Sequence, residues 1–425
     1  MLQKGTTSAG PGSASLILDA IRVAGTISRV GISQVTGLTG ATVSNVVRRL
    51  LEQDLILEIG RAESTGGKPR VLLELNPTAR YAIGVHLDHS ALTFVVVNLA
   101  GAPVFQETQS GIAQASPDEV VERMAHEVDA MILRSGIERE RVLGVGLVSP
   151  GPLTSQSGIH LAPPFMKHWE EYPLDVRLSE ATGLPVLLEN DATASAVGEY
   201  WSGGTDREAN FATLFMGTGL GAGLFMQGSQ YSGASGNAGE VGHTCVDING
   251  PQCWCGMRGC VEFMAGPHAV VAKAHSDSVL AHELGLTALP PDSEITSQFA
   301  VIATASAAGN TRARALLEES ARYIAVAAHS VANILDLQMI VLTGQGFAAA
   351  SDIYLPRLQE TLSNSFFARS SHSVDVRLSR AAETAAAIGG AAIVLQSEFV
   401  PQRSASLVAN VRKAGAVSEL STLSK

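Results

Sequence analysis

The stretch that decides the interpretation of this chain begins with the sequence GEVGH at Gly239–His243. It continues, ten residues after His243, with CWCGMRGCVE at Cys253–Glu262. These two segments place three thiols and one imidazole within the 18 residues from His243 to Cys260, and the glycines between them let the backbone turn back on itself. Structural zinc sites commonly use three Cys and one His in a tetrahedron. The stretch therefore predicts a structural Zn²⁺ site, with the ligands His243, Cys253, Cys255 and Cys260.

The distribution of the cysteines favours a metal over disulfide bonds. All four cysteines of the 425 residues lie between positions 245 and 260, whereas a disulfide framework spreads its cysteines along the chain. The alternative is a cysteine-rich loop without a metal. Cys245 lies two residues after His243 and could replace it as the fourth ligand. Otherwise we expect Cys245 to be a small buried residue.

Two carboxylates accompany the expected ligands. Glu240 lies three residues before His243, and Glu262 lies two residues after Cys260. A metal that fixed this loop would also fix both carboxylates, which accept hydrogen bonds. The pair predicts a site that faces a polyhydroxylated ligand.

Length and composition exclude several classes of protein. A chain of this length suggests two or three domains, and 46% hydrophobic with 16% charged residues can bury a sizeable core. No apolar run is long enough to span a bilayer, and the first residues lack the apolar region of a signal peptide. We therefore expect a cytoplasmic protein with no membrane partner.

Charge is distributed unevenly along the chain. Residues 1–80 hold nine Lys and Arg against six Asp and Glu, a net charge of +3, while the whole chain has a net charge of −11. A small basic segment attached to an acidic body is typical of a DNA-binding module joined to a larger domain.

The basic segment has the pattern of three helices. Apolar residues at helical spacing predict a first helix over Leu16–Ala24 and a second from about Arg29 to Thr36. In the third, an apolar stripe runs from Val43 to Leu51. Its opposite face carries polar and basic residues, namely Thr42, Ser44, Asn45, Arg48 and Arg49. The polar beginning of such a helix can enter a major groove, so these five residues are predicted to bind DNA.

A hairpin completes this segment. Leu55–Ile59 and Val71–Leu75 are predicted strands, and the loop between them is rich in glycine and carries Lys68 and Arg70. Three helices and a basic hairpin predict a winged helix-turn-helix over residues 13–78, in which Lys68 and Arg70 contact phosphates or a minor groove. The alternative is a small helical cap that makes only protein contacts.

From residue 79 onward the pattern changes. Predicted strands and helices alternate, and glycine turns follow strands at Ser149–Pro152, Met216–Gly223 and Thr343–Gly346. This pattern is typical of an α/β protein that binds its ligands at the strand ends.

The combination resembles the ROK family (repressor, open reading frame, kinase), which has an actin-like, hexokinase-like fold. The resemblance covers residues from about 15 to 400, and the winged helix is similar to that of the branch of regulators that includes the N-acetylglucosamine and xylose repressors. It implies a ROK sugar-kinase-like body over 79–400 that binds the effector and dimerises. The implied lobes are 79–191 and 192–385, with a last helix over 386–398 that returns to the first lobe. Residues 1–12 and 401–425 are expected to be mobile.

The resemblance also implies roles for single residues. His243, Cys253, Cys255 and Cys260 match the zinc ligands of the family. The positions that bind sugar hydroxyls in the family match Asn190, Asp191, Glu240, His243 and Glu262. In the kinases of the family, the Asp that matches Asp191 is the general base.

One segment departs from the kinase pattern. Where the kinases have Asp-x-Gly-Gly-Thr, this chain has the sequence HLDHS at His86–Ser90. The change removes a carboxylate that would help to hold Mg²⁺, and it removes two glycines that let the backbone approach a phosphate. We therefore expect no ATP, no Mg²⁺ and no catalytic residue, with Asp191 at the vestigial position of the base.

The sequence thus predicts a transcriptional regulator that responds to a sugar or amino sugar, a repressor of genes for carbohydrate uptake or catabolism. A homodimer or tetramer would bind an inverted repeat of operator DNA. Two alternatives are an active ATP-dependent sugar kinase with an appended DNA-binding module and a DNA-binding protein that needs no effector.

Overall fold

The computed structural model describes residues 11–61, 70–112, 115–151, 169, 172–202, 210–286, 288, 289, 291 and 294–399. The described residues fall into two compact units. One comprises the residues up to Arg80 together with the end of the last helix from Leu395, and the other comprises Tyr81–Val394. Residues 1–12 and 401–425 were expected to be mobile. Of these, residues 1–10 and 401–425 lie outside the described residues, as does Lys68, whereas Pro11 and Gly12 lie in the first helix. Among the helices that are described, none combines the length and the apolar character needed to cross a bilayer.

The first unit packs three helices on a small antiparallel sheet. The helices are α1 (Pro11–Ala24), α2 (Arg29–Thr36) and α3 (Gly40–Glu52). The strands follow the order β1-β3-β2, with β1 over Ile27–Ser28, β2 over Ile56–Arg61 and β3 over Val71–Leu75. Helix α1 begins two residues before the expected start of the domain, since proline is well suited to a first helical position.

Capping residues fix the turn between α2 and α3. Gly37 ends α2 in the left-handed conformation with a φ of 70°, and the side chain of Thr39 accepts a hydrogen bond from the backbone N–H of Thr42 at the start of α3. The apolar stripe predicted for α3 faces inward, because Val43, Val46, Val47 and Leu50 are all buried.

The second unit contains two lobes whose sheets share one strand order. In the first lobe the order is β6-β5-β4-β7-β8, and in the second lobe it is β11-β10-β9-β12-β13. In each lobe the first three strands are antiparallel and the last two are parallel. The strands of the first lobe are β4 (Tyr81–Leu87), β5 (Ala91–Asn98), β6 (Pro103–Ser110), β7 (Val142–Ser149) and β8 (Val186–Asn190). Those of the second lobe are β9 (Phe211–Met216), β10 (Leu220–Met226), β11 (Ser229–Gln230), β12 (Met339–Thr343) and β13 (Asp375–Leu378).

Each lobe has a large core of its own. In the first lobe, α4 (Pro117–Ser135) and α5 (Leu174–Thr182) cover one face of the sheet. In the second lobe, the core lies between the sheet and a group of helices. These helices are α7 (Val261–Ala265), α8 (Pro267–Ser276), α9 (Ser278–Leu284), α10 (Ile295–Ala307), α11 (Thr311–Leu335), α12 (Gln345–Ala349) and α13 (Ser351–Ser365).

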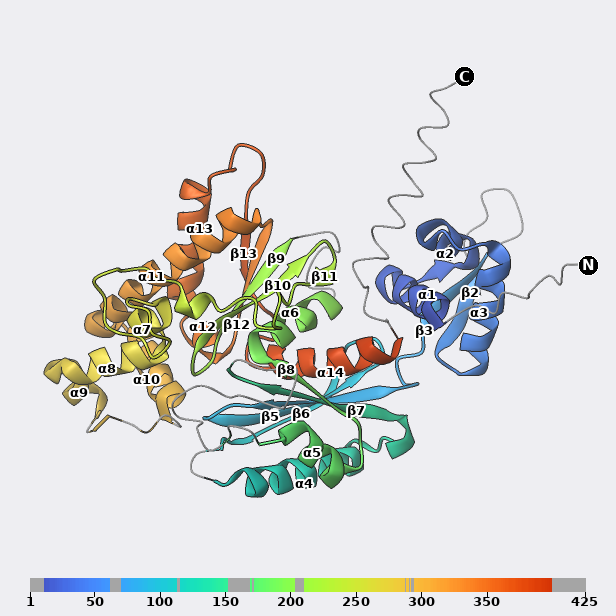
Figure 1. Ribbon diagram of the computed structural model, residues 1–425, viewed down its shortest axis with the longest axis horizontal. Helices are drawn as coiled ribbons and strands as arrows, with labels where there is room; N and C mark the ends of the chain where they lie inside the picture. Colours follow the sequence, from blue (N-terminus) through green and yellow to red (C-terminus); the bar gives the residue numbers. More distant parts are fainter. Residues whose placement is uncertain are drawn as a thin grey trace, which may run out of the picture. The chain divides into compact units, whose positions relative to one another are not determined.

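The last helix of each lobe packs on the sheet of the other lobe. Helix α6 (Asp191–Trp201) follows β8 but lies against β9 and β10. Helix α14 (Ala385–Phe399) follows β13 but lies over the sheet of the first lobe, on the face opposite α4 and α5 (Figure 1). The approach is so close that a Cβ atom at Gly84 would lie 1.7 Å from the carbonyl oxygen of Ala387, and one at Gly146 would lie 1.9 Å from that of Gly390.

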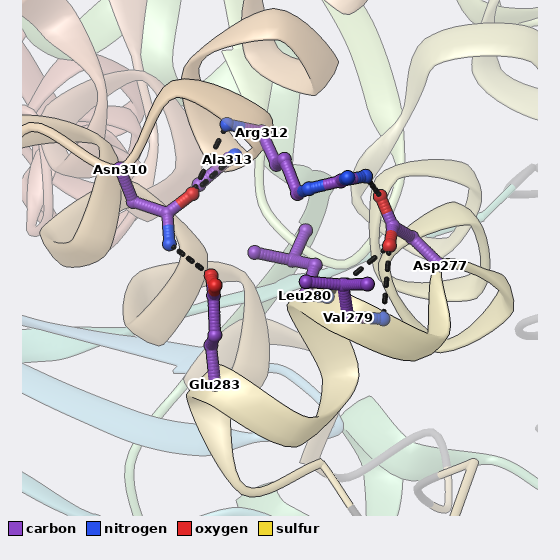
Figure 2. Close-up of polar contacts among 7 residues, drawn as sticks. All are labelled: Asp277, Val279, Leu280, Glu283, Asn310, Arg312 and Ala313. Carbon is purple, nitrogen blue, oxygen red and sulfur yellow. Dashed lines mark hydrogen bonds and ion pairs between the residues drawn. The ribbon is translucent and has the colours of Figure 1, made fainter.

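Polar side chains tie the beginnings of two helices in the second lobe to each other (Figure 2). Asp277 caps α9 by accepting hydrogen bonds from two of its backbone amides, and Asn310 caps α11 in the same way. Arg312 donates to Asp277 over 2.8 Å, and the side-chain amide of Asn310 donates to Glu283 over 2.8 Å. These contacts hold α9 against the first turn of α11.

Candidate functional site

The predicted metal ligands lie together. The ligand atoms of His243, Cys253, Cys255 and Cys260 are all within 4.8 Å of one another. Nδ1 of His243 is 3.6 Å from Sγ of Cys253, and Sγ of Cys255 is 3.6 Å from Sγ of Cys260. Ligands bound to one zinc ion at about 2.3 Å in a tetrahedron lie roughly 3.8 Å apart. The four side chains therefore fit a single tetrahedral metal ion.

Glycines shape the loop that carries these ligands. Gly256 and Gly259 have φ values of 95° and 61°, in the left-handed region that favours glycine. A Cβ atom at Gly259 would lie 1.7 Å from the carbonyl oxygen of Asp247, so no other residue fits there without a backbone shift. Cys260 directly precedes α7 at the N-cap position, and α7 anchors the loop in the core of the second lobe.

Cys245 is not one of the clustered ligands among the described residues. Its backbone pairs with that of Cys260 in an antiparallel bridge, and its side chain is half-buried. Within the cluster, burial and the neighbouring thiols raise the pKa of Cys260 to about 12. A bound cation would reverse this effect, because a coordinating thiol is deprotonated.

The orientation of His243 separates its two ring nitrogens. Nδ1 faces Cys253, and the ring meets that of Trp254 edge-on with the centroids 4.8 Å apart. If Nδ1 binds the metal, Nε2 is the nitrogen that is left for a second ligand.

Glu262 connects the metal loop to the glycine turn between β9 and β10. Its Oε2 accepts a hydrogen bond from the backbone N–H of Leu220 over 2.8 Å. A Cβ atom at Gly219 would lie 2.7 Å from the same oxygen, so the turn leaves room for this carboxylate. One oxygen of Glu262 is therefore engaged by the protein.

Glu240 precedes the short 3-10 helix that ends at His243. The residue as a whole is exposed, but the surroundings of its carboxylate raise its pKa, chiefly by desolvation. Glu262 adds to this effect and His243 opposes it. Glu240 lines a cavity together with Asn190 and Asn237 and with residues from the starts of α6 and β10. Asn237 was not predicted from the sequence, where its only signal is its place three residues before Glu240.

Asn190 and Asp191 lie at the junction of β8 and α6. Oδ1 of Asn190 caps α6 by accepting from the N–H groups of Ala192 and Thr193, and its Nδ2 donates to the carbonyl oxygen of Gly151 over 3.4 Å. The side-chain oxygen of Asn190 is thus occupied by the helix, and one of the two N–H groups on Nδ2 remains for a ligand.

Asp191 is buried, and burial raises its pKa to about 8. The carboxylates of Asp88 and Glu240 raise this pKa further, whereas a hydrogen bond from the N–H of Ala192 opposes the shift. The pKa of Asp191 therefore depends both on Glu240, which lines the cavity, and on Asp88, which belongs to the segment that departs from the kinase pattern.

That departing segment, His86–Ser90, lies beside the second glycine turn. The Thr218 hydroxyl donates to Oδ1 of Asp88 over 2.7 Å, and both residues are buried. His86 is also buried, and desolvation lowers its pKa although Asp88 acts in the opposite direction.

The residues predicted to bind DNA lie on the first unit. Ser44, Asn45, Arg48 and Arg49 are exposed on α3, whereas Thr42 is half-buried at its first turn. Arg48 donates to Oδ1 of Asn45 over 3.2 Å. Arg70 is exposed and directly precedes β3.

The model of the ROK family matches residues 82–397. The chain belongs to the ROK family. A putative xylose repressor of Caldicellulosiruptor sp. (strain Rt8B.4) is 28% identical over 382 residues, which cover 89% of this chain and 94% of the repressor. A crystal structure of a ROK family transcriptional regulator, a homolog of the E. coli MLC protein, matches with a TM-score of 0.71 at 25% identity and covers 92% of this chain and 96% of its own. The predicted resemblance to the regulators of this family is confirmed.

The match to a kinase of the family covers a smaller share of this chain than the match to the putative repressor does. The glucokinase of Halalkalibacterium halodurans is 27% identical over 325 residues, which cover 96% of the kinase but only 75% of this chain. The repressor match must include part of the first 81 residues, because residues 82–425 are too few to supply 89% of the chain. The N-terminal unit is thus shared, at least in part, with a repressor.

Proposed function

We propose that this protein is a transcriptional repressor whose affinity for operator DNA changes when a sugar binds its kinase-like body. The observation that carries the proposal is the coverage of the repressor match, which extends beyond the kinase-like body into the N-terminal unit.

In this proposal the N-terminal unit is a winged helix-turn-helix that reads operator DNA. Helix α3 lies in the major groove, where Thr42, Ser44 and Asn45 approach the bases and Arg48 and Arg49 approach the backbone. The hairpin between β2 and β3 is the wing, and it brings Lys68 and Arg70 to phosphates. A homodimer or tetramer presents two such units to an inverted repeat.

The effector site comprises Asn190, Asp191, Glu240, His243 and Glu262. Two observations support this assignment. Asn190 and Glu240 line one cavity. His243 and Glu262 shift the pKa of Glu240, and Glu240 in turn raises the pKa of Asp191. A structural Zn²⁺ ion on His243, Cys253, Cys255 and Cys260 fixes the loop that carries Glu240 and leads into Glu262. The pocket suits a sugar or amino sugar, because carboxylates accept from paired hydroxyls and the Asn190 amide donates.

We also propose that the kinase activity is lost. At His86–Ser90, the side chains of Asp88 and His89 are buried where the kinases have glycines. A negative charge at Asp88 would repel a nucleotide phosphate. The presence of Asp191 favours the alternative, an active sugar kinase. A coupled assay of ADP release from zinc-loaded protein with ATP, Mg²⁺ and a panel of sugars distinguishes the two, since turnover would establish the kinase.

The proposed function is tested by operator binding. Duplexes selected from a random library by the full-length protein are titrated in gel shifts with D-xylose, D-glucose and N-acetyl-D-glucosamine present one at a time. Arg48→Ala is expected to weaken DNA binding and to reduce the slope of log K against log salt by about one. The matched control is Arg314→Ala, which removes the same charge from α11, where Arg314 pairs with Glu318. Absence of sequence-selective binding, or an affinity that no sugar changes, would contradict the proposal.

A further inference from the structure

Two turns, one from each lobe, meet in a buried corner of the second unit. The turn between β4 and β5 contains Asp88, and the turn between β9 and β10 contains Thr218. These residues are 130 positions apart in the sequence, and each is only 4% exposed. The 2.7 Å hydrogen bond from the Thr218 hydroxyl to Oδ1 of Asp88 therefore joins the lobes in a site shielded from water.

The surroundings of Asp88 orient its carboxylate. Oδ1 also accepts from the backbone N–H of His89 over 2.6 Å, and Oδ2 faces the hydroxyl of Ser90 at 3.4 Å. A carboxylate that accepts several hydrogen bonds in a buried site is held in one orientation, and a hydrogen bond to a charged group is stronger than one between neutral groups.

A second contact between the lobes lies in the same corner. The ring of His86 on β4 meets that of Phe215 on β9 edge-on, with the centroids 5.8 Å apart. A Cβ atom at Gly217 would lie 2.9 Å from the Phe215 ring and 3.5 Å from Oδ2 of Asp88, so the β9–β10 turn approaches the corner closely because it has glycine there.

We propose that Asp88 and Thr218 form a latch that holds the two lobes together without any nucleotide, and that this latch sets the affinity of the effector site. The second part rests on the proposed function. The groups assigned to the effector come from both lobes, because Asn190 ends β8 in the first lobe, whereas Glu240 and Glu262 belong to the second. The separation between these groups thus depends on the position of one lobe relative to the other. The Asp88–Thr218 latch is a direct hydrogen bond between the lobes and helps to fix that position.

Hydrogen exchange of the full-length, zinc-loaded protein without ligand tests the latch. Thr218→Val replaces the hydroxyl by a methyl group in the second lobe, and Asp88→Ala removes the acceptor in the first. We expect Thr218→Val to speed exchange about tenfold in the peptide spanning residues 86–92, and Asp88→Ala to do the same in the peptide spanning 215–221. The double variant should exchange no faster than the faster of the two single variants, because both substitutions remove the same hydrogen bond.

Thr218→Ser is the matched control, since it keeps the hydroxyl and should exchange like the wild type. Zinc content and melting temperature establish that each variant folds, and Asp88→Asn is a second variant at that position that keeps an acceptor oxygen. If each substitution speeds exchange only in the peptide that contains it, or if the effects of the two substitutions add, there is no latch.

Calorimetric titration with D-xylose, D-glucose and N-acetyl-D-glucosamine tests the consequence for the effector. For any sugar that binds the wild type, Thr218→Val should weaken the affinity about tenfold, and Thr218→Ser should leave it unchanged. An unchanged affinity in Thr218→Val would overturn the link between latch and effector. If no sugar binds the wild type, the proposed effector function fails, while the exchange experiment still decides whether the latch exists.

Discussion

Burial dominates the chemistry of Asp191. Its pKa in the folded protein is about 8, compared with an ordinary value of 3.8. Between these values the folded state holds a proton that the unfolded state has lost. The stability that this proton contributes is fully present below about pH 3.8 and is lost as the pH rises through about 8.

Asp191→Asn should therefore change the pH dependence of stability. The free energy of unfolding of the wild type, relative to the variant, should fall by roughly 1.4 kcal/mol per pH unit up to about pH 8 and then level off. Urea unfolding of both proteins from pH 6 to pH 9 measures this difference. Other shifted groups, such as Glu189 and His86, are common to both proteins and cancel. Parallel curves for the two proteins would show that Asp191 ionises freely in the folded state.

At the scale of residues, the sequence indicated which residues are of interest, but it did not indicate all the contacts that they make. Asn190 was assigned to a sugar, but its Oδ1 is used to cap α6, a role that asparagine often has immediately before a helix. Asp88 stands where the kinase pattern has a glycine, and its side chain is buried in the corner between the lobes. Its partner Thr218 could not be predicted, because only tertiary folding brings two turns 130 residues apart into contact.

At the scale of elements, the metal loop makes a direct prediction. Cys260→Ser should lose most of its bound zinc and melt at a lower temperature, since Cys260 faces the other predicted ligands and directly precedes α7. Cys245→Ser should keep one zinc ion per chain, because Cys245 is outside the cluster. Metal analysis of the purified proteins by mass spectrometry gives the answer. Loss of zinc in Cys245→Ser but not in Cys260→Ser would make Cys245, in place of Cys260, the third thiolate ligand.

The cap of α11 allows a second prediction at this scale. Asn310→Ala should lower the free energy of unfolding by about 1 kcal/mol, because two backbone amides at the start of the helix lose their acceptor. Asn310→Ser should recover most of the loss, since serine is also a good cap. Denaturant melts at constant pH compare the three proteins, and equal stability of all three would mean that water replaces the side chain.

Elements defined by local patterns were predictable from the sequence. Helix α2 has the predicted bounds, and the stripe of α3 is buried as its periodicity indicates. The side chains of the four predicted metal ligands also lie close together. Spacing did not reveal that Glu262 would bind the N–H of Leu220, because that contact depends on how the metal loop packs against β10.

At the scale of the whole molecule, the proposed function requires that the sugar and the operator change each other's binding affinity by the same factor. If a sugar lowers operator affinity by some factor, the operator must lower sugar affinity by the same factor, and a coupling of about 1–3 kcal/mol corresponds to roughly 5–150-fold. Calorimetry with the sugar in the presence and absence of operator duplex measures one side, and gel shifts measure the other. Unequal factors would show that the sugar or the DNA binds at a second site.

The sequence also predicted the two-lobed α/β body, which the matches to the ROK family confirm. It did not predict that the two sheets would share one strand order, because the lobes differ in the helices inserted between their strands.

The exchange of α6 and α14 has a consequence for how this chain can be divided. Neither lobe is a self-contained stretch of polypeptide, since each is completed by a helix that follows the last strand of the other. A protein that stopped before residue 385 would leave Gly84 and Gly146 without the main chain that covers them, although their strands end far earlier in the sequence. The first lobe therefore cannot complete its packing during synthesis until nearly all of the second lobe has been made.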